Sequence, residues 1–345
     1  MQIVAYFDSH IENHMQECAY CSNQREKFAM SLPPVLSKLR IPVIGSPLFI
    51  ISTPELVIAQ CKAGVVGSFP SLNARSTEIL ESWLQQIIAA LEADPDAAPF
   101  AVNLIVHKSN NRLQEDLALC EQYQIPIVIT SLGANEDVNS RITAYGGVVL
   151  HDVINNRFAK KAIEKGATGL IAVAAGAGGH AGALSPFALV QEIRTWFDGP
   201  LILSGSIANG NAVLGAQAMG ADLAYIGSAF IATEEANADA GYKDALVQYA
   251  ANDIVYTNLF TGVHGNYLAP SIEAAGLDPS NLPESDPSQM NFSSGGDSES
   301  KAWKDIWGCG QGIGAVAAVL PTATFVDRLA GEYATAKSRL LALTA

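Results

Sequence analysis

Short apolar runs recur along the chain from residue 42 onward, and amphipathic stretches separate them. The runs are rich in Val and Ile and do not alternate with polar residues, which is typical of strands covered on both faces. They predict eight strands, at residues 42–46, 64–69, 100–106, 126–131, 146–152, 168–174, 200–205 and 222–228.

The stretches between these runs have helical spacing. Residues 74–93 carry an apolar stripe at intervals of three and four, and Thr53 followed by Pro54 is typical of a helix start. Eight strands that alternate with helices predict an α/β protein of the (β/α)₈ TIM-barrel type. An open doubly wound sheet is the alternative. The closed form is favoured because closure leaves no exposed strand edge.

Composition divides the chain into four parts. The barrel is expected over residues 30–264, and a surface excursion or lid over residues 265–312, which are rich in Pro, Ser, Gly and Asp. A C-terminal helix within residues 313–345 is expected to pack back onto the barrel. The polar residues 1–29 are expected to form a disordered tail, because the barrel pattern starts only at Pro42.

This tail raises the question of a metal site. His10, His14, Cys18 and Cys21 have spacings that resemble those of zinc ligands. A loose tail, or a true start at Met30, is the favoured interpretation, so no metal is predicted.

Charge and composition limit the partners. The formal net charge of −14 argues against nucleic acid and anionic membranes, which are bound by clustered Lys and Arg, and favours a small-molecule substrate. No uninterrupted apolar run reaches about 18 residues, and the N-terminus does not resemble a signal peptide. Five scattered cysteines indicate a reducing compartment, and we predict a cytoplasmic protein. The oligomeric state stays open, with a homodimer among the options.

The candidate chemistry lies at the strand ends, where barrels of this kind place their active sites. The sixth predicted strand runs into "AAGAGGHAG" (174–182), in which His180 stands among residues with almost no side chains. Such a bare backbone permits close approach to a flat ligand. Gly turns after the last two strands offer Gly205, Gly227 and Ser228 as backbone donors for a phosphate. No P-loop or G-x-G-x-x-G motif occurs, so a Rossmann NAD domain is not expected.

The segment "GAGGHAG", followed by "SGSIANG" and "GADLAYIGSAFIAT", resembles the nitronate monooxygenase (2-nitropropane dioxygenase) family. The resemblance extends from about Pro42 to the C-terminus, through "VNLIVHKSN", "FTGVHGNYLAPSI" and "WGCGQGIGAV". It implies an FMN-dependent barrel. The implied reaction is oxidation of alkyl nitronates, or of nitroalkanes, by O₂ to a carbonyl compound and nitrite.

The resemblance also implies roles for individual residues. His180 would be the substrate-facing base or hydrogen-bond donor, and Asn103 would contact the flavin ring. The remaining cofactor-binding residues would be Ser46, Pro47, Leu48, Gly178, Gly179, Gly205, Tyr225, Ile226, Gly227 and Ser228. The sequence departs from many relatives at three positions, with Val173 in place of Gln, Gly176 in place of an acidic residue and Ser206 in place of Gly.

Two other functions stay open at this point. One is a flavin reductase of the same fold that passes hydride from NAD(P)H to a quinone or enoyl substrate. The other is a non-catalytic barrel that binds a phosphorylated ligand. His151 and Asp152, at the end of the fifth predicted strand, either line the cleft or form a structural hydrogen-bonded pair. Cys309, within "GCGQG", is expected to have a packing role.

Overall fold

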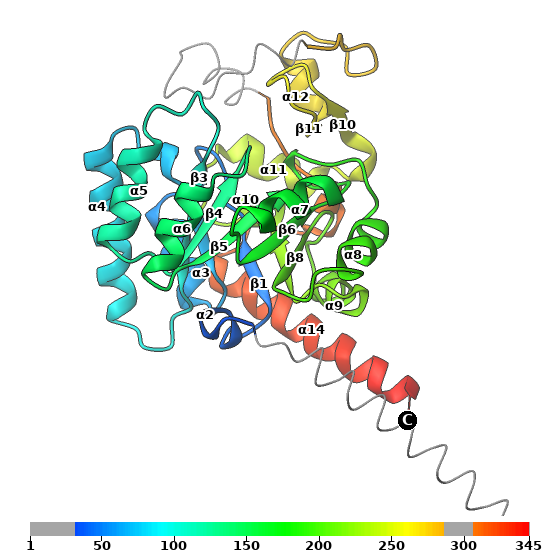
Figure 1. The fold of residues 1–345 in the computed structure, drawn as a ribbon. Helices are drawn as coiled ribbons and strands as arrows, with labels where there is room; N and C mark the ends of the chain where they lie inside the picture. Colours follow the sequence, from blue (N-terminus) through cyan, green and yellow to red (C-terminus); the bar gives the residue numbers. More distant parts are fainter. Residues whose placement is uncertain (1–31, 286–305, 345) are drawn as a thin grey trace, which may run out of the picture.

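Eight parallel strands form a closed barrel in the computed structural model, which describes residues 32–285 and 306–344. The strands are paired in the order β1-β9-β8-β6-β5-β4-β3-β2, and the Gly45 N–H donates to the Val66 carbonyl at 2.7 Å where β1 meets the β2 side. The prediction of a closed (β/α)₈ barrel is confirmed (Figure 1). The strands are β1 Val43–Gly45, β2 Gly67–Pro70, β3 Phe100–Ile105, β4 Ile127–Ser131, β5 Val148–Val153, β6 Gly169–Val173, β8 Leu201–Ser204 and β9 Leu223–Ile226.

Helices cover the outside of the barrel and bury one face each. In α4, Leu80, Leu84 and Ile87 are buried, and the Ser76 hydroxyl caps the helix by accepting from the Ile79 N–H at 3.3 Å. α3 begins at Pro54 as expected, although Thr53 makes no side-chain cap bond. The helices are α2 Pro34–Ser37, α3 Pro54–Lys62, α4 Thr77–Glu92, α5 Leu113–Gln122, α6 Glu136–Ala144, α7 Asn156–Glu164, α8 Pro186–Arg194, α9 Gly210–Met219, α10 Ser228–Ile231, α11 Ala240–Gln248, α12 Ala269–Ala274 and α14 Thr322–Thr344.

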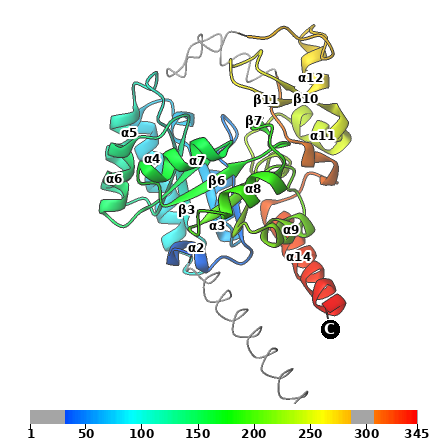
Figure 2. The same cartoon turned by 45° about the vertical axis from the view of Figure 1, so that its right-hand side comes forward.

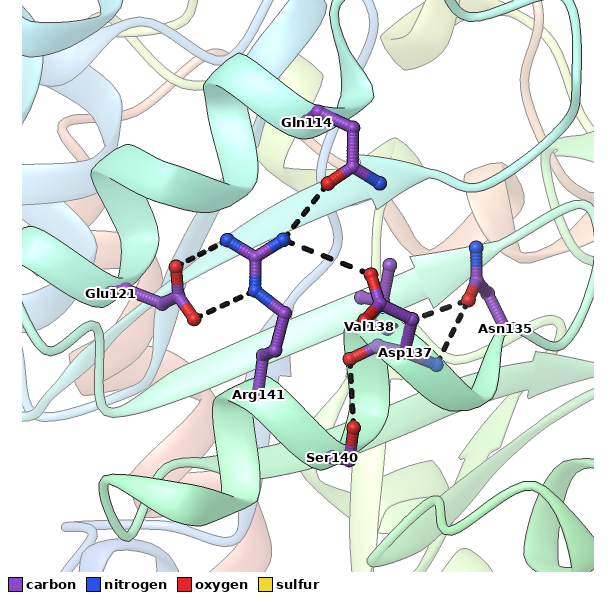
Figure 3. A network of polar contacts seen from close by, with 7 residues as sticks. All are labelled: Gln114, Glu121, Asn135, Asp137, Val138, Ser140 and Arg141. Atoms are coloured by element: carbon purple, nitrogen blue, oxygen red, sulfur yellow. Dashed lines mark hydrogen bonds and ion pairs between the residues drawn. The ribbon is translucent and has the colours of Figure 1, made fainter.

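Arg141 joins two of these helices (Figure 3). Its guanidinium, on α6, makes two parallel hydrogen bonds to the Glu121 carboxylate on α5 and a third to Gln114 Oε1 at 2.8 Å. Asn135 begins α6 by accepting from the Asp137 N–H at 3.1 Å. A bidentate arginine–carboxylate pair fixes relative orientation better than a single contact, so this network holds α5 and α6 in register on the barrel.

The last helix occupies the place of the eighth barrel helix. α14 packs against α9 and α3, which follow β8 and β1. A Cβ atom at Gly210, the first residue of α9, would lie 2.2 Å from the Tyr333 backbone nitrogen and 2.4 Å from the Leu329 carbonyl. The glycine therefore permits the start of α9 to lie directly on the backbone of α14.

A small second sheet stands at one end of the barrel (Figure 2). It consists of β10 Ile254–Thr257, β11 Gly265–Leu268 and the two-residue strand β7 Gly179–His180, all antiparallel. Within the segment expected as an excursion or lid, the structure thus contains β11, α12 and the 3₁₀ turn η4 Gln311–Ala315. The predicted tail, with its His and Cys residues, lies outside the described residues. No helix in the described ranges has the length and apolarity needed to cross a membrane.

Candidate active site

A large cleft opens at the carboxyl ends of the barrel strands. Its volume is about 1310 Å³, above the roughly 300–1,000 Å³ of a typical small-molecule site. Every residue predicted to be catalytic or to bind the cofactor lines this cleft except Ile226. Ile226 is fully buried in the core between barrel and helices, and its carbonyl accepts from the Ser46 N–H at 2.8 Å. The order of strands around the barrel therefore brings residues that are far apart in the sequence, from Ser46 to Gly310, into the same cleft.

His180 reaches the cleft on β7 rather than on a helix start. β7 pairs with β11, so that His180 lies opposite Gly265 and Gly179 opposite Asn266. The Asn266 side chain anchors the same segment by donating to the Ala177 carbonyl at 2.6 Å. A Cβ atom at Gly265 would lie 2.6 Å from the Gly179 carbonyl oxygen, so only glycine permits this close pairing.

One hydrogen bond orients the His180 ring. Its Nε2 lies 2.9 Å from the Thr261 hydroxyl, and that hydroxyl donates to the Val263 carbonyl at 3.0 Å. The Thr261 oxygen therefore accepts from Nε2–H, which makes Nδ1 the basic nitrogen. Burial lowers the pKa of His180 to about 4. The imidazole is thus neutral at pH 7, and it is a weaker base than a histidine exposed to water.

The two glycines before His180 are needed for different reasons. A Cβ atom at Gly178 would lie 2.8 Å from the Gly310 nitrogen and 2.8 Å from the Ser228 hydroxyl. Gly179 has φ +64°, and a Cβ atom there would meet nothing within 4 Å. Gly178 therefore makes room for the chain around residue 310, whereas Gly179 permits a left-handed turn beside open space.

The turns after β8 and β9 meet the late segment "GCGQG". The Gly310 N–H donates to the Ser228 hydroxyl at 2.8 Å, and the Gln311 N–H donates to the Gly176 carbonyl at 2.9 Å. Gly205 has φ +137°, and Ser206 adopts φ +57°. A left-handed conformation is uncommon outside glycine, so Ser206 occupies a position at which glycine would have less backbone strain.

The loop after β1 forms one wall of the cleft. Within Ser46–Leu48, the Leu48 N–H donates to the Ser52 hydroxyl at 2.9 Å, and the Leu48 carbonyl accepts from the Asn73 side chain at 3.0 Å. The Leu48 backbone groups thus have partners within the protein.

Asn103 begins a chain of hydrogen bonds across three neighbouring strands. Its Nδ2 donates to the Ile129 carbonyl at 3.2 Å and to the Ser131 hydroxyl at 2.8 Å. The Ser131 hydroxyl donates in turn to Asp152 Oδ2 at 2.5 Å. Asn103 therefore donates hydrogen bonds to groups of the neighbouring strand β4 and also lines the cleft.

His151 and Asp152 both line the cleft, and each has its bond to a different residue of β4. His151 Nδ1 lies 2.6 Å from the Thr130 hydroxyl, and burial lowers the pKa of His151 to about 4. Burial raises the pKa of Asp152 to about 6, against the opposing effect of the bond from Ser131. Sequence reasoning had identified the pair but missed Ser131, because its role depends on strand register rather than on any motif.

Cys309 and His264 have ordinary surroundings. Cys309 is fully buried, and burial raises its pKa, in agreement with the expected packing role. His264 is exposed and stacks on Tyr256 with ring centroids 5.0 Å apart.

The part of the cleft wall near residue 307 was missed by sequence reasoning. There Tyr242 and Trp307 stack at 5.0 Å, and the Tyr242 hydroxyl donates to the Gly308 carbonyl at 2.8 Å.

A closed (β/α)₈ barrel with a cleft at the carboxyl ends of its strands places this chain in the class of barrel proteins that hold a small molecule there.

Similar proteins identify the family within this class. Residues 34–329 match the family model described as nitronate monooxygenase, and the chain belongs to this family. It is a nitronate monooxygenase-like flavin oxidoreductase.

Relatives with known names support this assignment. The chain is 27% identical to a nitronate monooxygenase of Paraburkholderia phytofirmans over 289 residues, which cover 69% of this chain and 76% of the relative. A second relative is a Rhodococcus jostii protein named (3aS,4S,5R,7aS)-5-hydroxy-7a-methyl-1-oxo-octahydro-1H-indene-4-carboxyl-CoA dehydrogenase. It is 25% identical over 224 residues, which cover 65% of this chain and 60% of the relative.

Solved structures share the fold. The nitroalkane oxidase of Streptomyces ansochromogenes superimposes with a TM-score of 0.77 at 22% identity, covering 89% of this chain and 99% of that one. FabK from Thermotoga maritima gives a TM-score of 0.72 at 20% identity, covering 90% of this chain and 97% of that one.

Proposed function

We propose that this chain binds FMN and oxidises alkyl nitronates, and nitroalkanes after removal of a proton, with O₂ to a carbonyl compound and nitrite. The observation that carries the proposal is the placement of His180. A neutral imidazole lines the cleft, oriented through Thr261 and preceded by a glycine with open space beside it. This is the arrangement that a base beside a flat cofactor requires.

The described residues fit such a cofactor. The bare segment around Gly179, the loop Ser46–Leu48 and Asn103 on β3 all line the cleft. Gly205, Gly227 and Ser228, with Tyr225 on β9, would hold the phosphate, whereas Ile226 is buried in the core away from the cleft. When bound, FMN supplies the electron acceptor of the reaction and passes the electrons on to O₂.

The residues of the chain provide the proton chemistry. With a neutral nitroalkane, His180 takes the proton from the carbon next to the nitro group at Nδ1, while Thr261 holds Nε2–H. The resulting imidazolium then lies beside the nitronate anion. With a preformed nitronate, His180 needs only to orient the anion. A comparison of neutral nitroalkanes with preformed nitronates should therefore separate the role of His180 as a base from its role in orienting the anion.

The experiment compares two substrates in two histidine variants. The purified protein should show the visible absorbance of FMN and consume O₂ with propyl nitronate in the absence of NAD(P)H. His180→Asn should retain FMN and lose turnover of neutral nitropropane by about 100-fold or more, a usual contribution of a general base. His264→Asn is the matched control, because His264 is exposed and is not part of the cleft wall.

Three outcomes would overturn the proposal. Undiminished nitropropane turnover in His180→Asn would remove the base role. Rapid anaerobic bleaching of the flavin by NADH or NADPH, with no O₂ uptake on nitronate, would instead identify a flavin reductase. A colourless protein that takes up no FMN would exclude both activities.

A further inference from the structure

Asp152 is a carboxyl group inside the cleft with no cation to neutralise it. It stands near the end of β5, and its oxygen Oδ1 is buried and makes no hydrogen bond within the described residues. The other oxygen, Oδ2, accepts from the Ser131 hydroxyl at 2.5 Å. An ionised carboxylate in such a place is costly unless a ligand or a proton compensates it.

The hydrogen bonds around Asp152 have a fixed direction. Asn103 Nδ2 donates to the Ser131 oxygen, so the Ser131 proton is committed to Asp152 Oδ2. Asn103, Ser131 and Asp152 all line the cleft. The bond from Ser131 therefore fixes the orientation of the carboxyl group. Because Oδ1 is enclosed by the protein, the carboxyl group acts on an occupant of the cleft through its charge.

The groups around Asp152 are uncharged at neutral pH. Burial raises the pKa of Tyr225, on β9, and the charge of Asp152 raises it further. Burial lowers the pKa of His151 on β5 and of His180 on β7 to about 4. The cation Lys161, on α7, lines the same cleft but is exposed to solvent. A negative charge on Asp152 would thus be the main charge beside a ligand in this part of the site.

We propose that the Asp152 carboxyl group sets the reduction potential of a flavin bound in the cleft, opposing the reduction of the flavin when it is ionised and not when it is protonated. This inference rests on the flavin binding of the proposed function. A reduced flavin carries more negative charge than an oxidised one, so a nearby carboxylate disfavours reduction, whereas a neutral carboxyl does not. Because burial raises the pKa of Asp152 to about 6, the change between these forms falls in an accessible pH range.

The test is the midpoint potential of the bound flavin, measured against a reference dye at pH 5 and pH 8 with no substrate present. Asp152→Asn should raise the potential at pH 8 by about 30 mV or more, which is a tenfold change in relative affinity for reduced and oxidised flavin in a two-electron couple. At pH 5 the variant and the wild type should agree, because Asp152 is protonated in the wild type. Asp239→Asn is the control, because Asp239 lines the cleft but is exposed.

A second variant keeps the inference testable if Asp152→Asn folds poorly. Ser131→Ala removes the bond that stabilises the ionised carboxylate. The additional fall in potential that accompanies ionisation of Asp152, beyond the fall due to protonation of the flavin itself, should therefore occur at a higher pH than in the wild type. An Asp152→Asn protein with the wild-type potential at pH 8, or with the same shift at both pH values, would overturn the role of Asp152. Flavin bound with an unchanged potential refutes this inference alone, whereas a protein that binds no flavin refutes the proposed function as well.

Discussion

Gly178 provides a sharp test of how the glycine segment is built. Alanine at this position would place Cβ 2.8 Å from the Gly310 nitrogen and from the Ser228 hydroxyl, and 3.0 Å from the Cys309 carbonyl carbon. Ordinary contacts of Cβ atoms begin at about 3.4 Å, so the backbone near residue 310 must move by roughly 0.6 Å. That movement also strains the 2.8 Å bond from the Gly310 N–H to Ser228.

The expected cost follows from these two effects. Overpacking against backbone costs about 1–3 kcal/mol, and the loss of one hydrogen bond costs about 0.5–1.5 kcal/mol. Gly178→Ala should therefore lower the free energy of unfolding by about 2–4 kcal/mol. Gly179→Ala meets no atom within 4 Å and should cost only the strain of its left-handed backbone, about 1–2 kcal/mol. Gly215 lies inside α9 and also has no close neighbours. Gly215→Ala should therefore raise the free energy of unfolding by about 0.5–1 kcal/mol.

Urea denaturation of the three variants, followed by circular dichroism with the flavin removed, measures these differences. The slopes of the unfolding curves should match the wild type, so that the midpoints report stability alone. A Gly178→Ala protein that loses no more stability than Gly179→Ala would refute the reasoning, because the chain at Gly310 would then not be pressed against residue 178.

Three further predictions concern the site and the helix layer. The kcat/KM for neutral nitropropane should fall as pH drops through about 4, because His180 becomes protonated and can no longer accept a proton. A pH profile without this fall at low pH would contradict the assignment of His180 as the base. Thr261→Val should lower this kcat/KM by about tenfold or more with FMN affinity unchanged, because Nε2–H loses its acceptor; unchanged kinetics would show that Thr261 does not orient the ring. Arg141→Ala should cost about 1 kcal/mol at pH 7 in urea denaturation. Because Arg141 lowers the pKa of Glu121, the stability that their pair contributes should be lost as pH falls and Glu121 is protonated, and a cost that does not shrink in acid would contradict this.

The barrel was predictable from the sequence because its signals are local. Each buried parallel strand is a short Val- and Ile-rich run, and each helix has its own apolar face, so all eight strands were expected near where they occur. The same reasoning placed the Gly205 and Gly227 turns at one end, since parallel strands present their carboxyl ends on the same side.

What stayed hidden depends on contacts between distant residues. β7 is only two residues long, and it exists because Gly265 and Asn266 pair with it from far along the chain. The link from Asn103 through Ser131 to Asp152 depends on strand register, which no short motif encodes. The lowered pKa of His180 is likewise a property of the assembled cleft, because burial there depends on segments from several parts of the chain.

The position of α14 has a consequence for the order in which the molecule can be completed. The helix α14, which packs on the helices after β1 and β8, is synthesised after every strand of the barrel. Before α14 is synthesised, the helices beside β1 lack their packing partner, and the edges of the incomplete sheet can pair with another chain. Chains that lack α14 should therefore be prone to aggregate, and removing a few turns of α14 should increase that tendency.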